Sequence, residues 1–551
     1  MSRLPVVGII MVAVAARAWL LFGTHYMPGV NGAYYLVQAR SLIERGVLGI
    51  PDMPLTFHLH AALAWLLAKM SGMAQAEAIV WVVKLCDAAL PPLVAWPVFL
   101  LVQRWAKARG QGDAVPLAAA ALACFAWPWF RMVGELQKNS LALVWLGVLA
   151  MTLHGWLGAP TIKRGCAVLA CLLLLGLTHI GVLGATVVML AAVMLAFTAL
   201  QGGYARWRHV LPWIAAGSVI LGLAAALVLW KFDPVRIHRL ISALRNPAEF
   251  SEAGMQMPVP PHSRMNPVRW LPSIAFAAVV VPGLVLAWRR RGSQPAADVA
   301  LVAGAAITVL AMTGPWFSMD KAMRFYLIAL LPAIVVAAFG ALHITSPWMR
   351  GCVIGATLLI GIGSTLTTLR LGGSAILSDS AMIELRSLAQ HISRPERTLV
   401  CAQHGVEWWT AWFLHTRIAQ ASALRSEDWQ RYDSVCFLEI KSGLHMPFGP
   451  GGGRPPGGDP RGFSPPGPGL PDGMAPPPAR GANPMMSAPI PPDAEVLHDG
   501  ACLKFARVAT PPDGILSRIG KTPSPRSGPG GDRDTTALKT NSLFQVAFKM
   551  S

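Results

Sequence analysis

The feature that most constrains this chain is a long succession of apolar runs, each close to the length of a membrane-spanning helix. A transmembrane helix needs about 20 mostly apolar residues to cross the hydrocarbon core of a bilayer. Hydrophobic residues make up 54% of the 551 residues and charged residues only 13%, with a mean hydropathy of +0.49. We therefore predict a mainly α, polytopic membrane bundle of about eleven transmembrane helices. The runs lie near residues 5–23, 77–103, 115–130, 139–157, 165–181, 182–200, 209–230, 270–288, 297–314, 324–343 and 351–369.

The positive charges indicate how such a bundle is oriented. The formal charge of +19 comes mostly from Lys and Arg in short gaps between the apolar runs and in the C-terminal tail. Short basic loops stay on the cytoplasmic side, and here the basic loops alternate along the chain. We predict a multi-pass protein of the inner (plasma) membrane, with a cytoplasmic N-terminus and the lipid bilayer, not nucleic acid, as its partner. The outer loops would be 24–76, 131–138, 231–269, 315–323 and everything beyond 370.

The pattern changes after the last apolar run. Short β-type runs and helices replace the long apolar segments, so we predict a transmembrane domain over 1–370 and a small α/β domain over 371–510 on the outer, periplasmic or extracellular, side. A Pro/Gly-rich stretch at 447–492 cannot bury enough apolar surface to fold and is predicted to be a disordered insertion. The tail at 511–551 is predicted to be disordered for the same reason. The predicted elements are 397–403, 406–415, 433–440 and 495–508.

The eight cysteines show no CxxC motif and no metal-ligand spacing. Five of them lie inside apolar segments, where a cysteine is usually a small core residue. A disulfide among Cys401, Cys436 and Cys502, in the predicted outer domain, is left open by the sequence. No cofactor is indicated, and a bound divalent metal ion stays an open alternative.

The first outer loop carries two helical patterns. Apolar residues from Tyr35 to Ile43 repeat at helical spacing against polar ones, which predicts an amphipathic helix that can lie on the membrane surface. The stretch 55–70 is apolar but short, and making it a span would put the basic residues 104–109 outside. It is therefore predicted to be a juxtamembrane helix.

The same loop resembles the first outer loop of the GT-C superfamily of membrane glycosyltransferases. That superfamily includes the protein O-mannosyltransferases and the aminoarabinose transferases, in which an acidic motif precedes a YxxxAR helix and then a proline–leucine turn. In the segment 28–46, Tyr35, Ala39 and Arg40 occupy the helix positions, and the Pro–Leu pair at 54–55 occupies the turn. The resemblance implies a GT-C-like fold for the transmembrane domain.

Two further segments agree with the resemblance. The sequence WFRMVGELQKNS at 129–140 resembles the second outer loop of the family, with Glu135 as the matching acid. The sequence RFYLIALLP at 324–332 resembles the recurrent start of a later helix on the same face. Together the likeness covers most of 1–370.

The resemblance implies transfer of a sugar from a polyprenyl-phosphate-linked donor to an envelope acceptor on the outer face. Such a reaction needs a groove for the lipid, cations for the phosphate and a general base beside the anomeric carbon. The sugar and the acceptor are not indicated by the sequence. The residues that the topology then implies are Arg324, Arg131 and Lys138 at the donor phosphate, and Tyr34, Tyr35 and Arg40 as acceptor or lipid contacts.

One departure from the family pattern bears directly on catalysis. The expected catalytic aspartate falls at Asn31, whose amide can bind a hydroxyl but cannot take its proton. Asp52 and Glu135 are the acids that could substitute as catalytic residues. Asp52 could instead be a turn residue before Pro54, and Glu135 could simply pair with a neighbouring cation.

Other functions stay open beside the transferase. The loss of the aspartate at Asn31 also fits a catalytically impaired relative that binds a glycolipid or acts as a scaffold. A secondary transporter is a further alternative, although the sequence shows no internal repeat. The HGVEWW motif, with His404, Glu407 and Trp408, could line a sugar-binding surface, or its tryptophans could dock the outer domain onto the membrane face.

Overall fold

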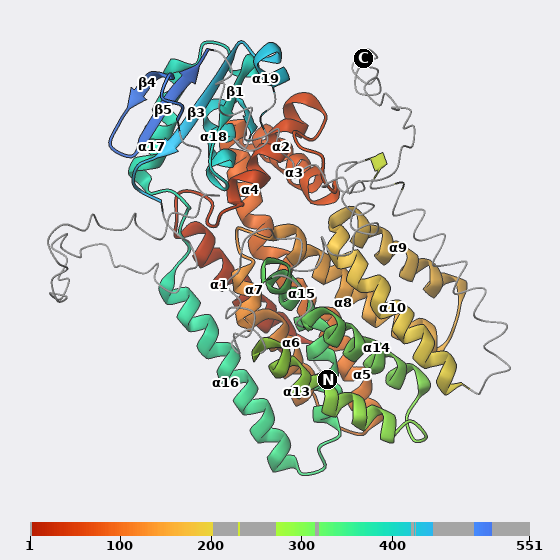
Figure 1. The fold of residues 1–551 in the computed structure, drawn as a ribbon. Helices are drawn as coiled ribbons and strands as arrows, with labels where there is room; N and C mark the ends of the chain where they lie inside the picture. The colour runs from red at the N-terminus through yellow and green to blue at the C-terminus, as the bar shows by residue number, and fades with distance from the viewer. Residues whose placement is uncertain are drawn as a thin grey trace, which may run out of the picture.

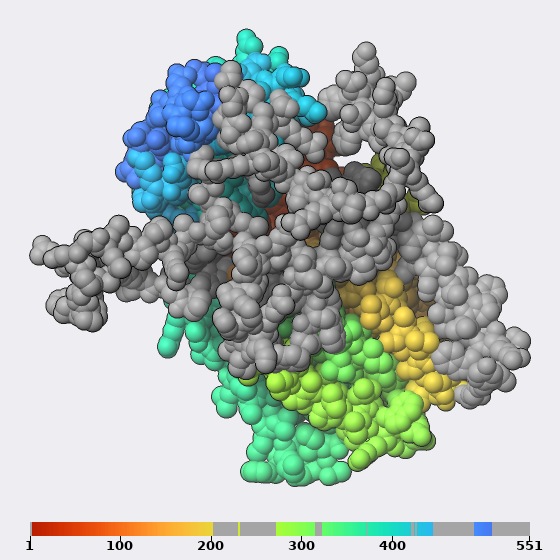
Figure 2. All heavy atoms as spheres, viewed as in Figure 1, coloured from red at the N-terminus to blue at the C-terminus, as the bar shows by residue number. Residues whose placement is uncertain are grey.

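The computed structural model describes residues 3–201, 227, 230–231, 271–314, 319–419, 424, 426–444 and 490–509. Figure 1 shows a bundle of long helices with a small α/β domain at one end, and Figure 2 shows the same domain in blue and cyan. Four predicted segments lie wholly or mostly outside the described residues. They are the apolar run 209–230, the outer loop 231–269, the insertion 447–492 and the tail 511–551.

The mainly α membrane bundle is confirmed. Nine helical segments among the described residues are long and apolar enough to cross a membrane. The helix α9 (Ile162–Thr178) also matches a predicted run but has only 17 residues, so the total of about eleven spans stays a prediction. The nine candidate spans are Leu4–Phe22 (α1), Gln75–Ala108, Ala114–Arg131, Gln137–Gly158 (α8), Ile180–Leu200 (α10), Leu271–Arg289 (α13), Ala296–Thr313 (α14), Ala322–Leu342 and Pro347–Arg370.

Two of the predicted runs are not single helices. The run at 77–103 is divided at Pro91 and Pro92, because proline lacks the N–H that continues an α-helix. The run at 115–130 is interrupted at Ala126, which adopts an extended conformation with ψ 140°. The elements of these two runs are α4 (Gln75–Ala89), η1 (Pro91–Val94), α5 (Ala95–Ala108), α6 (Ala114–Phe125) and α7 (Trp127–Arg131). Two later helices extend beyond their candidate spans, α15 (Met319–Leu342) and α16 (Pro347–Leu371).

Both helices predicted in the first outer loop are present, as α2 (Gly32–Arg45) and α3 (Leu55–Ser71). Each ends at a glycine in the left-handed conformation, Gly46 and Gly72, as is common at helix C-termini. The apolar face of α2 is buried against α3, α4 and the C-terminal domain, which is called the outer domain after its predicted side of the membrane. This helix is therefore a layer between the bundle and the domain.

A buried ion pair joins three separate parts of the bundle. Arg17 of α1, only 2% exposed, donates to the Asp87 carboxylate at 2.6 Å and to the backbone carbonyls of Asp87 and Trp129 at 2.8 and 2.9 Å. The second Asp87 oxygen accepts the Gly134 N–H at 2.6 Å. A charge in an apolar span is costly unless it is paired, and here the contacts together join α1, α4, α7 and the second outer loop.

The outer domain contains one five-stranded sheet of order β2-β1-β3-β5-β4. Strands β2, β1 and β3 are parallel, whereas β5 runs antiparallel to β3 and to β4. The helix α18 connects β1 to β2, which brings its N-terminus to the carboxyl end of β1. The elements of the domain are α17 (Asp379–Ser387), η6 (Leu388–His391), η7 (Pro395–Arg397), β1 (Thr398–Cys401), α18 (Val406–Leu414), β2 (Arg417–Ala419), α19 (Ser426–Arg431), β3 (Ser434–Ile440), β4 (Glu495–Asp499) and β5 (Leu503–Val508).

The small C-terminal α/β domain is thus confirmed, with two corrections of detail. The run 495–508 is a hairpin of two strands rather than one strand, because the chain reverses at residues 500–502. The short strand β2 was not predicted, since three residues carry no periodic signal. Cys401, Cys436 and Cys502 are buried free thiols in the structure, so no disulfide forms among them.

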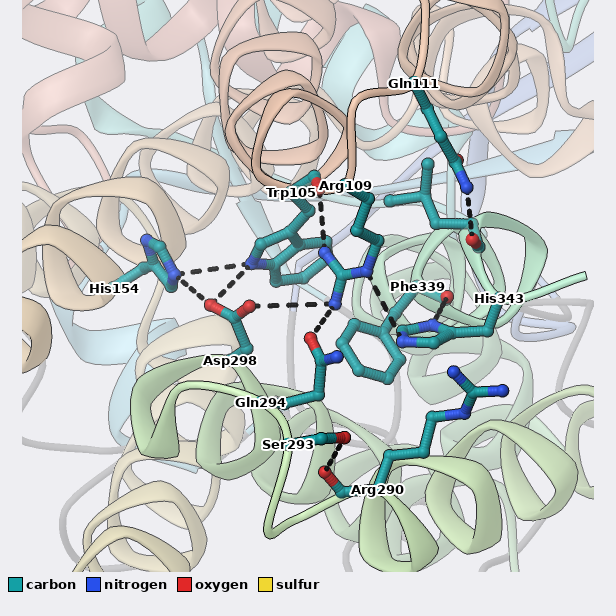
Figure 3. A network of polar contacts seen from close by, with 11 residues as sticks. Trp105, Arg109, Gln111, His154, Arg290, Ser293, Gln294, Asp298, Phe339 and His343 are labelled. Carbon is teal, nitrogen blue, oxygen red and sulfur yellow. Dashed lines mark hydrogen bonds and ion pairs between the residues drawn. The ribbon is translucent and has the colours of Figure 1, made fainter.

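A second polar network lies at the end of the bundle away from the domain, where α15 turns into α16 (Figure 3). Asp298 of α14 accepts hydrogen bonds from His154 at 2.7 Å and Trp105 at 3.0 Å, and lies 3.8 Å from Arg109. Arg109 also contacts His343 at 3.4 Å. Arg109, one of the basic residues from which the orientation of the bundle was predicted, therefore also links helices α5, α14 and α15.

The closest helix approach among the described glycines is at Gly304. A Cβ on Gly304 of α14 would lie 2.2 Å from Val193 Cγ2 and 2.8 Å from the Val193 backbone nitrogen of α10. Small residues allow such close contact between membrane helices.

We predict that Gly304→Ala destabilises the bundle by about 1–3 kcal/mol, since the added methyl overpacks the α10–α14 contact. Thermal unfolding in detergent measures the change. Gly355→Ala is the matched control, because a Cβ on this α16 glycine meets nothing within 4 Å. Equal melting temperatures for the two variants would contradict the prediction.

Candidate functional site

The centre of the candidate site is the Asp52 carboxylate, which is only 3% exposed. One of its oxygens accepts the Met53 N–H at 2.7 Å. The other accepts hydrogen bonds from the Tyr34 hydroxyl and from Lys138 Nζ, which also forms an ion pair with it. Asp52 therefore makes a backbone hydrogen bond as a turn residue would, and its catalytic role stays a prediction.

The loop that carries Asp52 is held to α2 by a buried glutamine. Gln38 Nε2 donates to the Ile50 carbonyl at 2.7 Å and to the Tyr34 hydroxyl at 3.0 Å, and Gln38 Oε1 accepts from Ile50 N at 3.1 Å. Burial, reinforced by the charge of Asp52, raises the pKa of the Tyr34 phenol well above its usual value. Tyr34 therefore stays a hydrogen-bond donor to the carboxylate.

The second outer loop packs directly on the first. Gly134 has φ +74°, and a Cβ there would lie 2.4 Å from the Pro28 carbonyl oxygen. The Tyr35 hydroxyl lies 3.4 Å from both the Glu135 carbonyl oxygen and the Lys138 backbone nitrogen. Tyr34 and Tyr35, predicted as acceptor or lipid contacts, thus connect the two loops around Asp52.

The second acid, Glu135, lies in a cluster of cations. Its carboxylate is 3.3 Å from Arg131. This agrees with the alternative prediction that Glu135 pairs with a neighbouring cation. Burial raises the pKa of the Glu135 carboxyl, while Arg131 and Arg324 act to lower it. Arg324, exposed near the start of α15, is therefore close enough to Glu135 for their charges to interact.

Two predicted site residues are not part of this cluster of charges. Asn31 precedes α2 at its N-terminal boundary, and its side chain makes no capping hydrogen bond. Arg40 donates to the Trp412 and Ala411 carbonyls at 2.7 Å each, and its guanidinium lies 4.8 Å from the centre of the Trp412 ring. Arg40 thus holds the C-terminal end of α18 and binds the outer domain to the first loop.

The tryptophans of the HGVEWW motif also pack against the first loop. Trp408 and Tyr34 have ring centres 4.8 Å apart, and Trp409 and Tyr26 have ring centres 5.5 Å apart. Gly29 N also donates to the Ser374 carbonyl at 3.0 Å. These contacts place the outer domain on the first loop, next to the Asp52 cluster.

A cavity of about 830 Å³ opens between α2 and the outer domain. Its walls carry both charges and aromatic rings, which suits a polar ligand better than a lipid tail. Trp408 lines it, and the Tyr34 ring that packs on Trp408 carries the hydroxyl bonded to Asp52. Charged groups on its walls include Arg40, Glu44, Arg45, His404, Glu407 and Arg417.

Several buried polar atoms near the site have no hydrogen-bond partner among the described residues. They include Thr56 Oγ1, His60 Nδ1 and both side-chain polar atoms of Gln137. Burial lowers the pKa of His60 to about 3, so this imidazole is neutral. Within the described part of the chain, no three His, Cys, Asp or Glu side chains converge as a metal site would require.

Some of these positions could have been found from the sequence, and some could not. Arg17 stands inside an apolar run, so a buried partner for it was predictable. Gln38 and Gln137 carry no such signal, because a glutamine on a helix is usually solvated. Their importance comes only from the loops that fold over them.

The chain matches known proteins in structure but not in sequence. No protein-family model matches the chain, and no curated protein matches it in sequence. Its fold is similar to that of two crystal structures of ArnT from Cupriavidus metallidurans. The apo structure has 13% identity and a TM-score of 0.45 over 79% of this chain and 92% of that chain. The structure bound to undecaprenyl phosphate has 14% identity and a TM-score of 0.44 over the same shares.

We predict that Lys138→Met destabilises the protein by about 3–5 kcal/mol, because it leaves the Asp52 carboxylate buried without its cation. Thermal unfolding of the full chain in nanodiscs measures the loss. Lys163→Met is the control, since Lys163 is exposed in the first turn of α9. Adding Asp52→Asn to Lys138→Met should recover part of the loss, and equal losses in the single and double variants would contradict the ion-pair explanation.

Proposed function

We propose that this chain is a membrane glycosyltransferase that moves a sugar from a polyprenyl-phosphate-linked donor to a hydroxyl-bearing envelope acceptor. The observation that carries the proposal is the convergence of acids and cations, one pair of them buried, where the two loops meet the outer domain. Asp52 and Lys138 lie at its centre, beside Glu135 and its arginines. The nine candidate spans among the described residues support a multi-pass membrane protein.

The proposed roles follow from the charges that change during transfer. The acceptor oxygen forms a bond to the anomeric carbon, the bond from that carbon to the phosphate oxygen breaks, and polyprenyl phosphate leaves with the electron pair. Arg131 and Arg324 are positioned to stabilise the phosphate, because a preorganised cation acts most strongly where charge develops. Lys138 would act with them while it holds Asp52. We place this site on the outer face of the plasma membrane, with the N-terminus in the cytoplasm.

A second function is favoured by one observation, the amide at Asn31 in place of an acid. A protein with this cluster but no base would bind a glycolipid without transferring its sugar. The two functions differ in their need for the cations, which is the basis of the next experiment.

Deletion of the gene should remove one sugar from envelope glycans, lipids or glycoproteins, as measured by mass spectrometry. Complementation with Arg324→Gln should restore that sugar at least about tenfold more slowly than the wild-type gene, because a cation that stabilises developing charge is lost. Arg289→Gln is the matched control, since Arg289 is an exposed arginine at the end of α13. Full restoration by Arg324→Gln would favour the binding function, and an unchanged glycan profile in the deletion strain would contradict the transferase.

A further inference from the structure

The loop between β1 and α18 docks on the segment that carries Asn31. Gly405 in this loop has φ +93°, and a Cβ there would lie 2.6 Å from Val30 Cγ1 and 2.6 Å from Ile376 Cδ1. Only glycine allows both this backbone conformation and this close approach. His404 and Asn31 are the chain neighbours of the two residues in contact, so the docking joins the segment that carries the histidine to the segment that lacks the expected acid.

His404 forms a pair with a buried carboxylate. Its Nδ1 lies 2.8 Å from Glu407 Oε1, and Glu407 is only 3% exposed. Because a carboxylate accepts, Nδ1 carries the proton, which leaves Nε2 as the acceptor nitrogen of the neutral ring. The His404 side chain is 58% exposed and lines the cavity between α2 and the outer domain. Its reactive nitrogen is therefore accessible to a ligand.

The charges around His404 belong to the same site. The hydrogen bond to Glu407 raises the pKa of His404, burial and Arg324 lower it, and Glu135 raises it, with a net upward shift. These groups come from α18, from α15 and from the second outer loop. His404 is therefore within electrostatic reach of the residues assigned above to the donor phosphate.

We propose that His404 is the general base of the transfer reaction and that Glu407 is the positioning residue that orients it, in place of the acid missing at Asn31. The proposal rests on the proposed function. His404 Nε2 takes the proton of the acceptor hydroxyl as its oxygen bonds to the anomeric carbon, and polyprenyl phosphate leaves with the electrons of the broken bond. The imidazolium then releases its proton to solvent.

The other acids are less suited to this step. Both oxygens of Asp52 already accept hydrogen bonds, one from Met53 and one from Tyr34 and Lys138. Glu135 is paired with Arg131. In contrast, Glu407 Oε1 holds His404 and Glu407 Oε2 is buried with no hydrogen-bond partner among the described residues, so this carboxylate orients the histidine rather than meeting the acceptor.

A rescue experiment in the deletion strain tests the base. His404→Ala should reduce restoration of the lost sugar by at least about 100-fold, in line with loss of a general base. Adding Asn31→Asp to His404→Ala should restore at least about a tenth of the wild-type level, because it returns a carboxylate to the adjoining segment. His391→Ala, in the same domain, is the matched control. Membrane levels of each variant are measured by immunoblotting.

The outcomes separate the proposal from the function it rests on. Full restoration by His404→Ala, or loss that Asn31→Asp does not rescue at equal membrane level, overturns the base assignment and leaves the transferase standing. A deletion strain that loses no sugar contradicts the transferase itself, and the base assignment with it.

A second measurement needs no substrate. Diethyl pyrocarbonate modifies neutral imidazole, so its rate at His404, followed by peptide mass spectrometry on the full chain in nanodiscs, gives the midpoint of titration. The midpoint should lie above 6.5 in the wild type, because Glu407 raises the pKa of His404. In Glu407→Gln it should fall, since the carboxylate charge is removed. An unchanged midpoint would show that Glu407 does not position His404.

Discussion

The ion pair between Arg17 and Asp87 is the interaction on which the arrangement of the site depends. Both side chains are buried, so the two charges must stabilise each other. Asp87 also accepts the Gly134 N–H, and Arg17 also donates to the Trp129 carbonyl. One pair thus fixes α1, α4, the short helix α7 and the middle of the second loop. The positions of Glu135 and Lys138 depend on this loop being held in one place.

The site is then assembled in layers from the bundle outward. Lys138, at the start of α8, fixes Asp52 and with it the end of the first loop. The helix α2 of that loop presents Tyr34 and Arg40 to the outer domain, which packs on it through α18. Each layer supplies one kind of chemistry: cations near the bundle, hydrogen-bonding aromatics in the loop, and a histidine–carboxylate pair from the domain. The proposed reaction needs all three at one junction.

Much of this arrangement could be predicted residue by residue. Hydropathy predicted the spans, helical spacing predicted α2 and α3, and the change of composition after residue 370 predicted the α/β domain. Asp52 and Glu135 were selected as acids in outer loops, and the structure places both beside cations. The breaks at Pro91 and Ala126 and the hairpin at 495–508 were missed, because apolar content is similar on both sides of each break. The roles of the site residues stay predictions.

The sequence by itself determined that this chain inserts in a membrane, because no other solvent accommodates so many apolar runs, and it determined which loops carry acids and cations. Only the tertiary structure decided which of those groups meet. Asn31 and His404 are more than 370 positions apart along the chain, and no local pattern relates them. The relation arises because Gly405 has no side chain and lets the domain approach Val30. Such contacts depend on how whole elements pack, which local periodicity does not encode.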